Sequence, residues 1–306
     1  MAVMMGISAA ITMPFYGALV RLRANYNPHA VGLDQHEARV GPTLHTLLGT
    51  LKRTKRLEGW WGLWKGTYPA LAYSTLLSIC SIIFVGGSAT KGPKNTYSVP
   101  EAGGVAMALF TIVLTLIALP MTILINRSII TPYKLPNNPK ISLRILLTSV
   151  EQEKPWTLYL TPGLLAATTA HAICATLIAR TMRVLFLGTA IISDKTAGDI
   201  AWWRWMFYII WQCFATLWFT PLEVIATRLS IQPNAGDVTP LGETEPPEGV
   251  TFCGTDEDVI GIRPATEPYL GMVDCTRKII EEEGWTSLYR GFWFTMLGNL
   301  FGSTIA

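Results

Sequence analysis

The sequence contains few charged residues. Asp, Glu, Lys and Arg make up 15% of the 306 residues and apolar residues make up 50%, whereas a soluble domain is usually about 25% charged. The charges also avoid several apolar runs, each long enough or nearly so to cross a bilayer. The net charge is only +3, and the basic residues form no aromatic-interleaved patch of the kind that binds nucleic acid. We therefore predict a multi-pass membrane protein that does not bind nucleic acid.

The sequence also lacks the motifs of enzymes and metal sites. The five cysteines are scattered without C-x-x-C spacing, which argues against a disulfide framework and against a metal site. There is no Gly-rich phosphate loop, and no Ser, His and Asp are arranged for nucleophilic catalysis. We expect no enzymatic activity, no metal and no cofactor.

A repeated pattern is present instead. Three prolines, each inside an apolar run, are 106 and 101 residues apart: Pro14, Pro120 and Pro221. Each run is followed by a polar stretch that ends in Glu and then Trp, clearly at Glu58-Gly59-Trp60 and Glu283-Gly284-Trp285 and more weakly at Glu153-Lys154-Pro155-Trp156. A fixed period of this length indicates three copies of one supersecondary unit. We assign the copies to residues 1–88, 101–190 and 200–306.

Each copy is predicted to contain two membrane helices and one amphipathic surface helix between them. The predicted membrane helices are 2–22, 67–86, 103–130, 162–189, 201–229 and 291–306, and the surface helices are 42–56, 140–152 and 271–282. The prolines are expected to kink the odd-numbered helices. Of the 24 Lys and Arg residues, 18 lie on the long-loop side, which predicts that this side faces the matrix or cytosol.

Two parts of the chain depart from this plan. Residues 232–268 contain eight acidic residues, six prolines and a single base, Arg263, a composition typical of a disordered insert. This insert is interpreted either as a solvated loop or as the docking site of a protein partner. The first and last membrane helices are short, so we expect the 306 residues to be part of a longer chain.

These patterns resemble the mitochondrial carrier family over nearly the whole chain. In that family each repeat has a proline-containing odd helix with the pattern P-x-[DE]-x-x-[KR]-x-[RK], followed by a surface helix that ends in [DE]-G and an aromatic-base-glycine that opens the even helix. The resemblance implies an all-α fold of six membrane helices around a central cavity with a pseudo-threefold axis. It also implies a mitochondrial lipid bilayer, with cardiolipin at the even-helix N-termini.

The resemblance further implies a ring of ion pairs that closes the long-loop side, but most of its charges are missing. The acid positions hold Tyr16, Thr122 and Glu223, and the base positions hold Leu19, Ile125 and Ala226. One acid and no base cannot form an ion pair, so we predict that this electrostatic gate is lost. Glu223 is either a functional carboxylate at membrane depth or a remnant at a hydrated helix end.

A second set of charges is retained. Three arginines lie two residues after the base positions, and three glutamates end the surface helices: Arg21, Arg127 and Arg228, with Glu58, Glu153 and Glu283. By resemblance, each arginine binds the glutamate of its own repeat and holds the surface helix to the odd helix. The alternative is that the arginines only extend to water.

The resemblance places the solute contacts about seven residues into each even helix, at Tyr73, Thr168, Thr169, Gly298 and Asn299. None is charged, which argues against nucleotides and di-acids as solutes. His171 lies one helical turn after Thr168, so it either faces the same cavity or is packed and hydrogen-bonded.

Two functions follow from these observations. The first is transport of a small, uncharged or weakly charged solute by alternating access, in the inner rather than the outer mitochondrial membrane. The alternative is a transport-inactive adaptor with the same fold in the outer membrane, acting in membrane fusion or fission or in protein insertion. Neither the solute nor a protein partner is identified.

Overall fold

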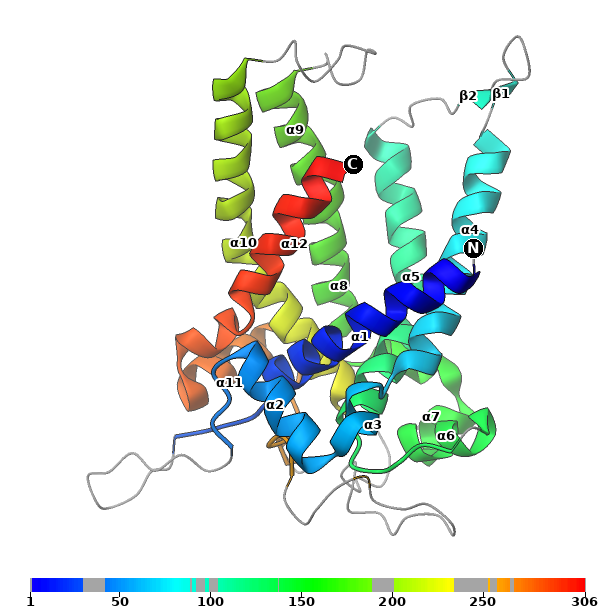
Figure 1. The fold of residues 1–306 in the computed structure, drawn as a ribbon, viewed down its shortest axis with the longest axis vertical. Helices are drawn as coiled ribbons and strands as arrows, with labels where there is room; N and C mark the ends of the chain where they lie inside the picture. The colour runs from blue at the N-terminus through cyan, green and yellow to red at the C-terminus, as the bar shows by residue number, and fades with distance from the viewer. Residues whose placement is uncertain are drawn as a thin grey trace.

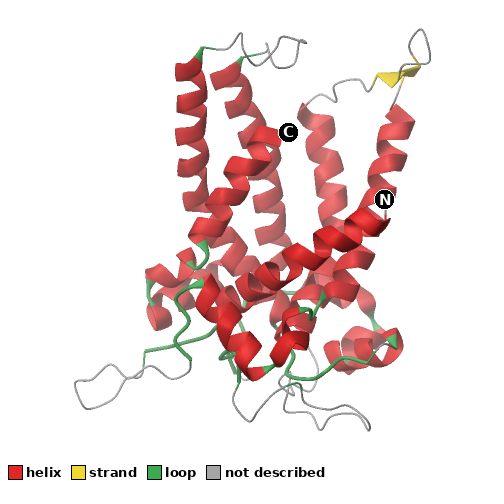
Figure 2. Cartoon of the chain, viewed as in Figure 1, coloured by secondary structure: helices red, strands yellow, loops and turns green. Residues whose placement is uncertain are grey.

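A computed structural model describes most of the chain, namely residues 2–29, 42–88, 90–91, 97–98, 104–136, 138–188, 201–233, 253, 258–264 and 267–305. Within these residues the secondary structure consists of helices joined by loops (Figure 2), with one pair of two-residue antiparallel strands, β1 (Thr90–Lys91) and β2 (Tyr97–Ser98). The all-helical prediction therefore misses only this small hairpin between two long helices.

Each predicted membrane segment is helical, with ends within a few residues of the prediction. The helices are α1 (Ala2–Ala24), α4 (Thr67–Ser88), α5 (Gly104–Ile130), α8 (Leu164–Ile173) continued by η3 (Cys174–Ile178) and α9 (Ala179–Leu187), α10 (Trp202–Ile231) and α12 (Phe292–Ile305). Figure 1 shows α1 crossing obliquely in front of α5. The π-helical turn η3 was not predicted from the sequence.

Four helical stretches of the described chain are long and apolar enough to cross a membrane: Gly59–Ile83, Ile112–Ile130, Leu164–Leu187 and Trp202–Ile231. The 14 residues of α12 extend about 21 Å at about 1.5 Å per residue, which is short of a hydrocarbon core of about 30 Å. A span at α1 and a span at α12 therefore stay predictions.

The three prolines lie inside α1, α5 and α10, and these three helices contact one another pairwise. Beyond the prolines, toward the long-loop side, apolar side chains from all three helices form one buried cluster. Its members include Val20, Leu22, Ile125, Ile129 and Ile231. The C-terminal ends of the odd helices therefore converge; we call this end of the molecule the base.

Surface helices lie at the base (Figure 1), as α2 (Leu47–Leu57), α3 (Gly59–Leu63), α6 (Pro139–Leu146), α7 (Ser149–Glu153), η2 (Pro155–Leu160), α11 (Met272–Glu283) and η6 (Trp285–Tyr289). The prediction of one helix over 140–152 is wrong, because Leu147 and Thr148 interrupt it. Thr148 caps α7 and forms a capping box with Glu151, which starts a new helix at this point.

Each even helix begins after a glycine in the left-handed region. Gly66, Gly163 and Gly291 have φ of 85°, 74° and 80°. A Cβ atom at these positions would come within 2.8 Å of Ile129, 2.1 Å of the Met272 nitrogen and 2.5 Å of Leu19. Both the backbone conformation and the close contact therefore require glycine, and the same arrangement occurs at all three positions.

The predicted insert 232–268 is ordered in part. Val259 and Ile260 are only 7% and 5% exposed and pack into the apolar cluster at the base, so the prediction of disorder is wrong for residues 258–264. The prediction used the composition of the whole insert, which is acidic and proline-rich. It therefore overlooked this short apolar segment, which is sufficient to enter a core. Residues 234–252, 254–257 and 265–266 lie outside the described residues.

Candidate functional site

The Glu223 carboxylate of α10 has a basic partner. Arg23 of α1 donates from Nη2 to Glu223 Oε2 at 2.5 Å, so the prediction that this acid cannot form an ion pair is wrong. Arg23 lies four residues after Leu19, which is one helical turn on the same face. Helical side chains lean toward the N-terminus of their helix, so a long arginine can reach back to the level of the empty base position.

Two further helices contribute to the same carboxylate. Thr295 of α12 donates to Glu223 Oε2 at 2.6 Å and accepts from Arg23 Nη2 at 2.8 Å. His171 of α8 places Nε2 3.6 Å from Glu223 Oε1. We call these four residues, from α1, α8, α10 and α12, the Glu223 cluster.

The open part of the Glu223 cluster is the His171 side. The side chains of His171 and Glu223 are 36% and 27% exposed, whereas that of Arg23 is 8% exposed. The His171 ring also packs edge-on against Phe219, with 5.2 Å between ring centroids. Of the two interpretations of His171, the structure shows a ring that is packed on one side and remains partly accessible beside an acid.

An uncharged contact replaces a second ion pair of the gate. Tyr16, in the α1 acid position, donates to Asn126 Oδ1 of α5 at 3.4 Å, and Asn126 Nδ2 donates to Ser230 Oγ of α10 at 2.7 Å. This chain of hydrogen bonds joins all three odd helices without a formal charge.

The remaining gate positions have no cross-helix polar contact in the described structure. The Thr122 hydroxyl donates to Ala118 O of its own helix. Leu19 and Ile125 are buried apolar residues, and Ala226 packs against an apolar cluster. Among the described residues, the gate positions therefore make one shifted ion pair, at Glu223, and one neutral cross-helix hydrogen bond, at Tyr16.

The retained arginines are fully buried and bind glutamates of the surface helices. Arg21 Nη2 lies 2.6 Å from Glu58 Oε2, and Arg228 Nη2 lies 3.0 Å from Glu283 Oε2. The three arginines are at most 2% exposed, which argues against the alternative that they extend to water.

Arg127 binds Glu151 rather than the predicted Glu153. Its two terminal nitrogens donate to Glu151 at 2.6 and 2.9 Å. Glu151 Oε2 also accepts from the Thr148 nitrogen in the capping box, which points the carboxylate inward. Glu153 is exposed at the end of α7. The sequence pattern of Thr148 followed by Glu151 is a capping-box signal that could have identified the correct acid.

The arginine sites also reach carbonyls at the end of the next odd helix. Arg127 donates to Gln232 O at 2.8 Å, and Arg228 donates to Asn25 O at 2.9 Å. At the third junction Lys65 donates to Thr131 O at 2.7 Å. These three acceptors each lie four residues after one of the buried arginines. The contact between each surface-helix site and the end of the neighbouring odd helix is therefore made in the same way three times.

Two bases that sequence reasoning missed complete these sites. Lys65 Nζ lies 2.7 Å from Glu58 Oε1, and Arg290 Nη2 lies 2.9 Å from Glu283 Oε2. Both precede the glycine that opens an even helix, and this shared position was the available signal. The corresponding residue before Gly163 is Pro162, which cannot donate.

The predicted solute contacts lie on three different even helices, α4, α8 and α12. Tyr73 is half-buried against the apolar cluster. Thr168 and Thr169 donate to Leu164 O and Leu165 O of their own helix. Asn299 Nδ2 lies 3.4 Å from Thr216 Oγ1 and Gly298 is exposed. Of the predicted set, His171 is the residue that the described structure brings to Glu223.

The last third of the chain matches a protein-family model. Residues 205–306 match the family model described as mitochondrial carrier protein, a segment that includes Pro221, Glu223, the Arg228–Glu283 pair and Thr295. The match confirms, over this third of the chain, the family that the sequence motifs indicated. No curated protein matches the chain.

Proposed function

Because residues 205–306 match the mitochondrial carrier family model, we propose that the whole chain belongs to this family and is a transporter that moves a small solute across a mitochondrial membrane by alternating access. The solute is uncharged or weakly charged. The inner membrane is the favoured location, since the family consists mainly of inner-membrane transporters.

The internal similarity of the described elements supports an arrangement of three carrier repeats. The proline helices, the buried arginine sites and the left-handed glycines each occur three times with comparable contacts. We propose that α1 and α12 complete a ring of six spans with the four candidate spans. This organisation places the odd-helix ends together at the base.

The observation that carries the proposed solute class is the Glu223 cluster. Its guanidinium and carboxylate cancel, so it offers no unpaired cation for a phosphate or a di-acid, which would need one. The partly exposed side chains of the cluster are those of Glu223 and His171. They suit a solute that donates hydrogen bonds, and we propose that Tyr73, Thr168, Thr169, Gly298 and Asn299 line the rest of its path.

Transport can be tested on purified protein in proteoliposomes. A thermal-shift screen of metabolites identifies ligands first, because a ligand that binds only the folded state raises the melting temperature. For the ligand found, Glu223→Gln should reduce saturable counter-exchange at least about tenfold, the equivalent of about 1.4 kcal/mol. The matched control is Glu153→Gln, the same change at an exposed acid. Equal uptake by both variants would contradict the role of Glu223.

The transport-inactive adaptor stays the second candidate, because five of the six gate positions carry no charge: Tyr16, Leu19, Thr122, Ile125 and Ala226. Protease access to intact mitochondria separates the two. Cleavage within 232–268 while the outer membrane is intact would place the protein in that membrane, exposing the insert to the cytosol, and favour the adaptor. Protection until the outer membrane is ruptured would favour the inner-membrane transporter.

A further inference from the structure

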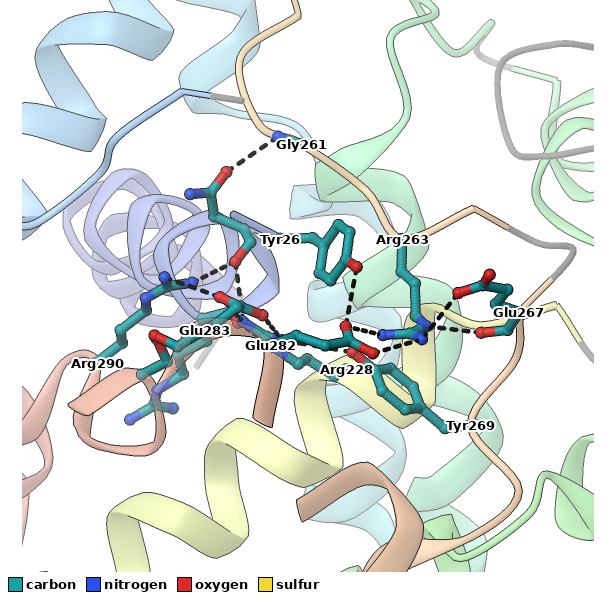
Figure 3. A network of polar contacts seen from close by, with 12 residues as sticks. Tyr26, Arg228, Gly261, Arg263, Glu267, Tyr269, Glu282, Glu283 and Arg290 are labelled. Carbon is teal, nitrogen blue, oxygen red and sulfur yellow. Dashed lines mark hydrogen bonds and ion pairs between the residues drawn. The ribbon is translucent and has the colours of Figure 1, made fainter. Parts of the chain in front are cut away.

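Residues 258–264, which we call the strap, lie against elements from both ends of the chain. Figure 3 shows Gly261 and Arg263 of the strap beside Tyr26, which follows α1, and beside Glu282 of α11. The strap lies on the base, next to the site where Arg228 and Arg290 bind Glu283. It is therefore outside the candidate membrane spans but adjacent to the converging helix ends.

The strap backbone is hydrogen-bonded to the segment that leaves α1. Tyr26 N donates to Gly261 O at 2.8 Å, and Gly261 N donates to Asn25 Oδ1 at 2.9 Å. A Cβ atom on Gly261 would lie 2.4 Å from Tyr26 O, so this close approach of two backbones depends on glycine. Arg53 of α2 holds the other end, donating to Asp258 O at 2.9 Å and to Val259 O at 3.1 Å.

The strap also contributes to the core. Val259 and Ile260 are buried in the cluster that contains Ile125 of α5 and Ile231 of α10. The strap thus contacts the cluster formed by all three odd helices, at the level where their C-terminal ends meet. Separating those ends would expose this apolar surface to water, which is unfavourable.

Arg263 fastens the strap to α11. Its Nη2 lies 2.9 Å from Glu282 Oε1 and its Nη1 also donates to Glu282, while the guanidinium lies 5.3 and 4.8 Å from the Tyr26 and Tyr269 ring centroids. Tyr26 OH donates to Glu282 Oε2 at 2.8 Å. The Arg263 side chain is only 8% exposed. The bidentate pair and the two flanking rings hold it in one position.

Burial alone would raise the pKa of Glu282, but the hydrogen bonds from Arg263 and Tyr26 outweigh it and leave that pKa below the usual value. The network therefore favours the ionised carboxylate. Glu282 in turn links Tyr26, after α1, to α11 of the last third of the chain, and His29 N donates to Glu282 O at 2.9 Å.

We propose that the strap is a clamp that holds the base closed from outside the membrane, in place of the gate charges that the odd helices lack. Opening the base requires the end of α1 to move away from α11 and α10. This movement must break the Tyr26–Gly261 bonds, withdraw Val259 and Ile260 and separate the Arg263–Glu282 contact from Tyr26. The proposed clamp requires only that the base of this protein opens. It does not depend on which solute, if any, is transported.

Hydrogen–deuterium exchange on the purified full chain tests the clamp directly. The readout is backbone exchange in peptides covering 24–29 and 258–264, which reports local opening. Arg263→Ala should accelerate exchange in both peptides at least about tenfold. The matched control is Arg277→Ala, which removes an arginine of α11 whose side chain is 76% exposed and pairs with Glu281 at 2.7 Å. This control should leave both peptides unchanged.

Two additional variants separate clamp release from misfolding. Gly261→Ala should open the same two peptides without changing any charge, because its Cβ collides with Tyr26 O. The exchanged pair Arg263→Glu with Glu282→Arg should restore slower exchange than Arg263→Ala alone. The proposal is overturned if Arg263→Ala and Gly261→Ala both melt like the parent protein and exchange at the parental rate in residues 24–29. This outcome does not depend on whether any solute is transported.

Discussion

The same three helices carry two sets of polar positions that differ sharply. Each buried arginine lies five residues after an acid position of the gate. The arginines are at most 2% exposed and bind glutamates, whereas the acid positions retain only one carboxylate, Glu223. The base of this protein is thus held by buried, fully charged sites a little over one helical turn below a mostly uncharged gate.

The difference reflects what each set must do. A buried ion pair keeps elements together, because removing either partner leaves an uncompensated charge. A gate must break and reform, so its pairs cannot be as fully enclosed. Here Glu223 remains 27% exposed, whereas the Glu151 side chain has no exposed surface. The contrast predicts that mutations at the arginine sites affect stability far more than mutations at the gate.

The largest effect is expected at Arg127. Arg127→Leu leaves the buried Glu151 carboxylate without its bidentate partner, which should cost about 3–5 kcal/mol of unfolding free energy. Thermal or denaturant unfolding in detergent measures this, with Arg144→Leu at an exposed position of α6 as the control. Arg228→Leu should cost less, since Arg290 still binds Glu283. Equal losses of unfolding free energy in all three variants would contradict the prediction that the buried arginine sites stabilise the fold more than exposed charges do.

The second-largest loss of stability is expected from a substitution at Gly163. Gly163→Ala puts a Cβ 2.1 Å from the Met272 nitrogen at a φ of 74°, and such backbone strain alone costs about 1–3 kcal/mol. Gly298→Ala is the control, because nothing lies within 4 Å of its Cβ position and alanine favours a helix by about 0.5–1 kcal/mol. The melting temperature should fall for the first variant and stay equal or rise for the second.

Acid should weaken the Arg263–Glu282 contact. The pKa of Glu282 is lowered in the folded state, so its carboxylate contributes stability above the ordinary glutamate pKa of about 4.3. That contribution is lost as the pH falls through the lower folded value. The difference in melting temperature between the parent protein and Glu282→Gln should therefore be present at pH 7 and smaller at about pH 3. A difference that grows on acidification would contradict the assignment.

The smallest effect is expected at the neutral gate contact. Tyr16→Phe removes a hydrogen bond of 3.4 Å to Asn126, which is long for such a bond, so the loss should be below about 1 kcal/mol. Asn126→Leu should cost more, because it also removes the 2.7 Å bond to Ser230. A loss at Tyr16 as large as that at Arg127 would show that the neutral gate is a main source of stability.

Much of the fold could be predicted because local pattern determines it. The apolar runs located each long helix to within a few residues, and the Glu-Gly-Trp stretches located the surface-helix ends. The partner of Arg127 was wrong by two residues, since a choice between two glutamates depends on which one points inward. The Arg23 partner of Glu223 was missed, because the family motif expects the basic residue at position 19. A long arginine side chain with four rotatable bonds can reach the same carboxylate from one helical turn later.

The sequence by itself determined the helices, the threefold recurrence of proline, arginine and glycine, and the family that they indicate, since each depends on residues near one another in the chain. Only the tertiary structure decided that Arg23, His171 and Thr295 surround Glu223 and that residues 258–264 pack against the base. The three contacts to Glu223 join residues that are 52, 72 and 200 positions apart. Hydrogen bonding and apolar burial select such partners by their position in space, and sequence spacing does not report that position.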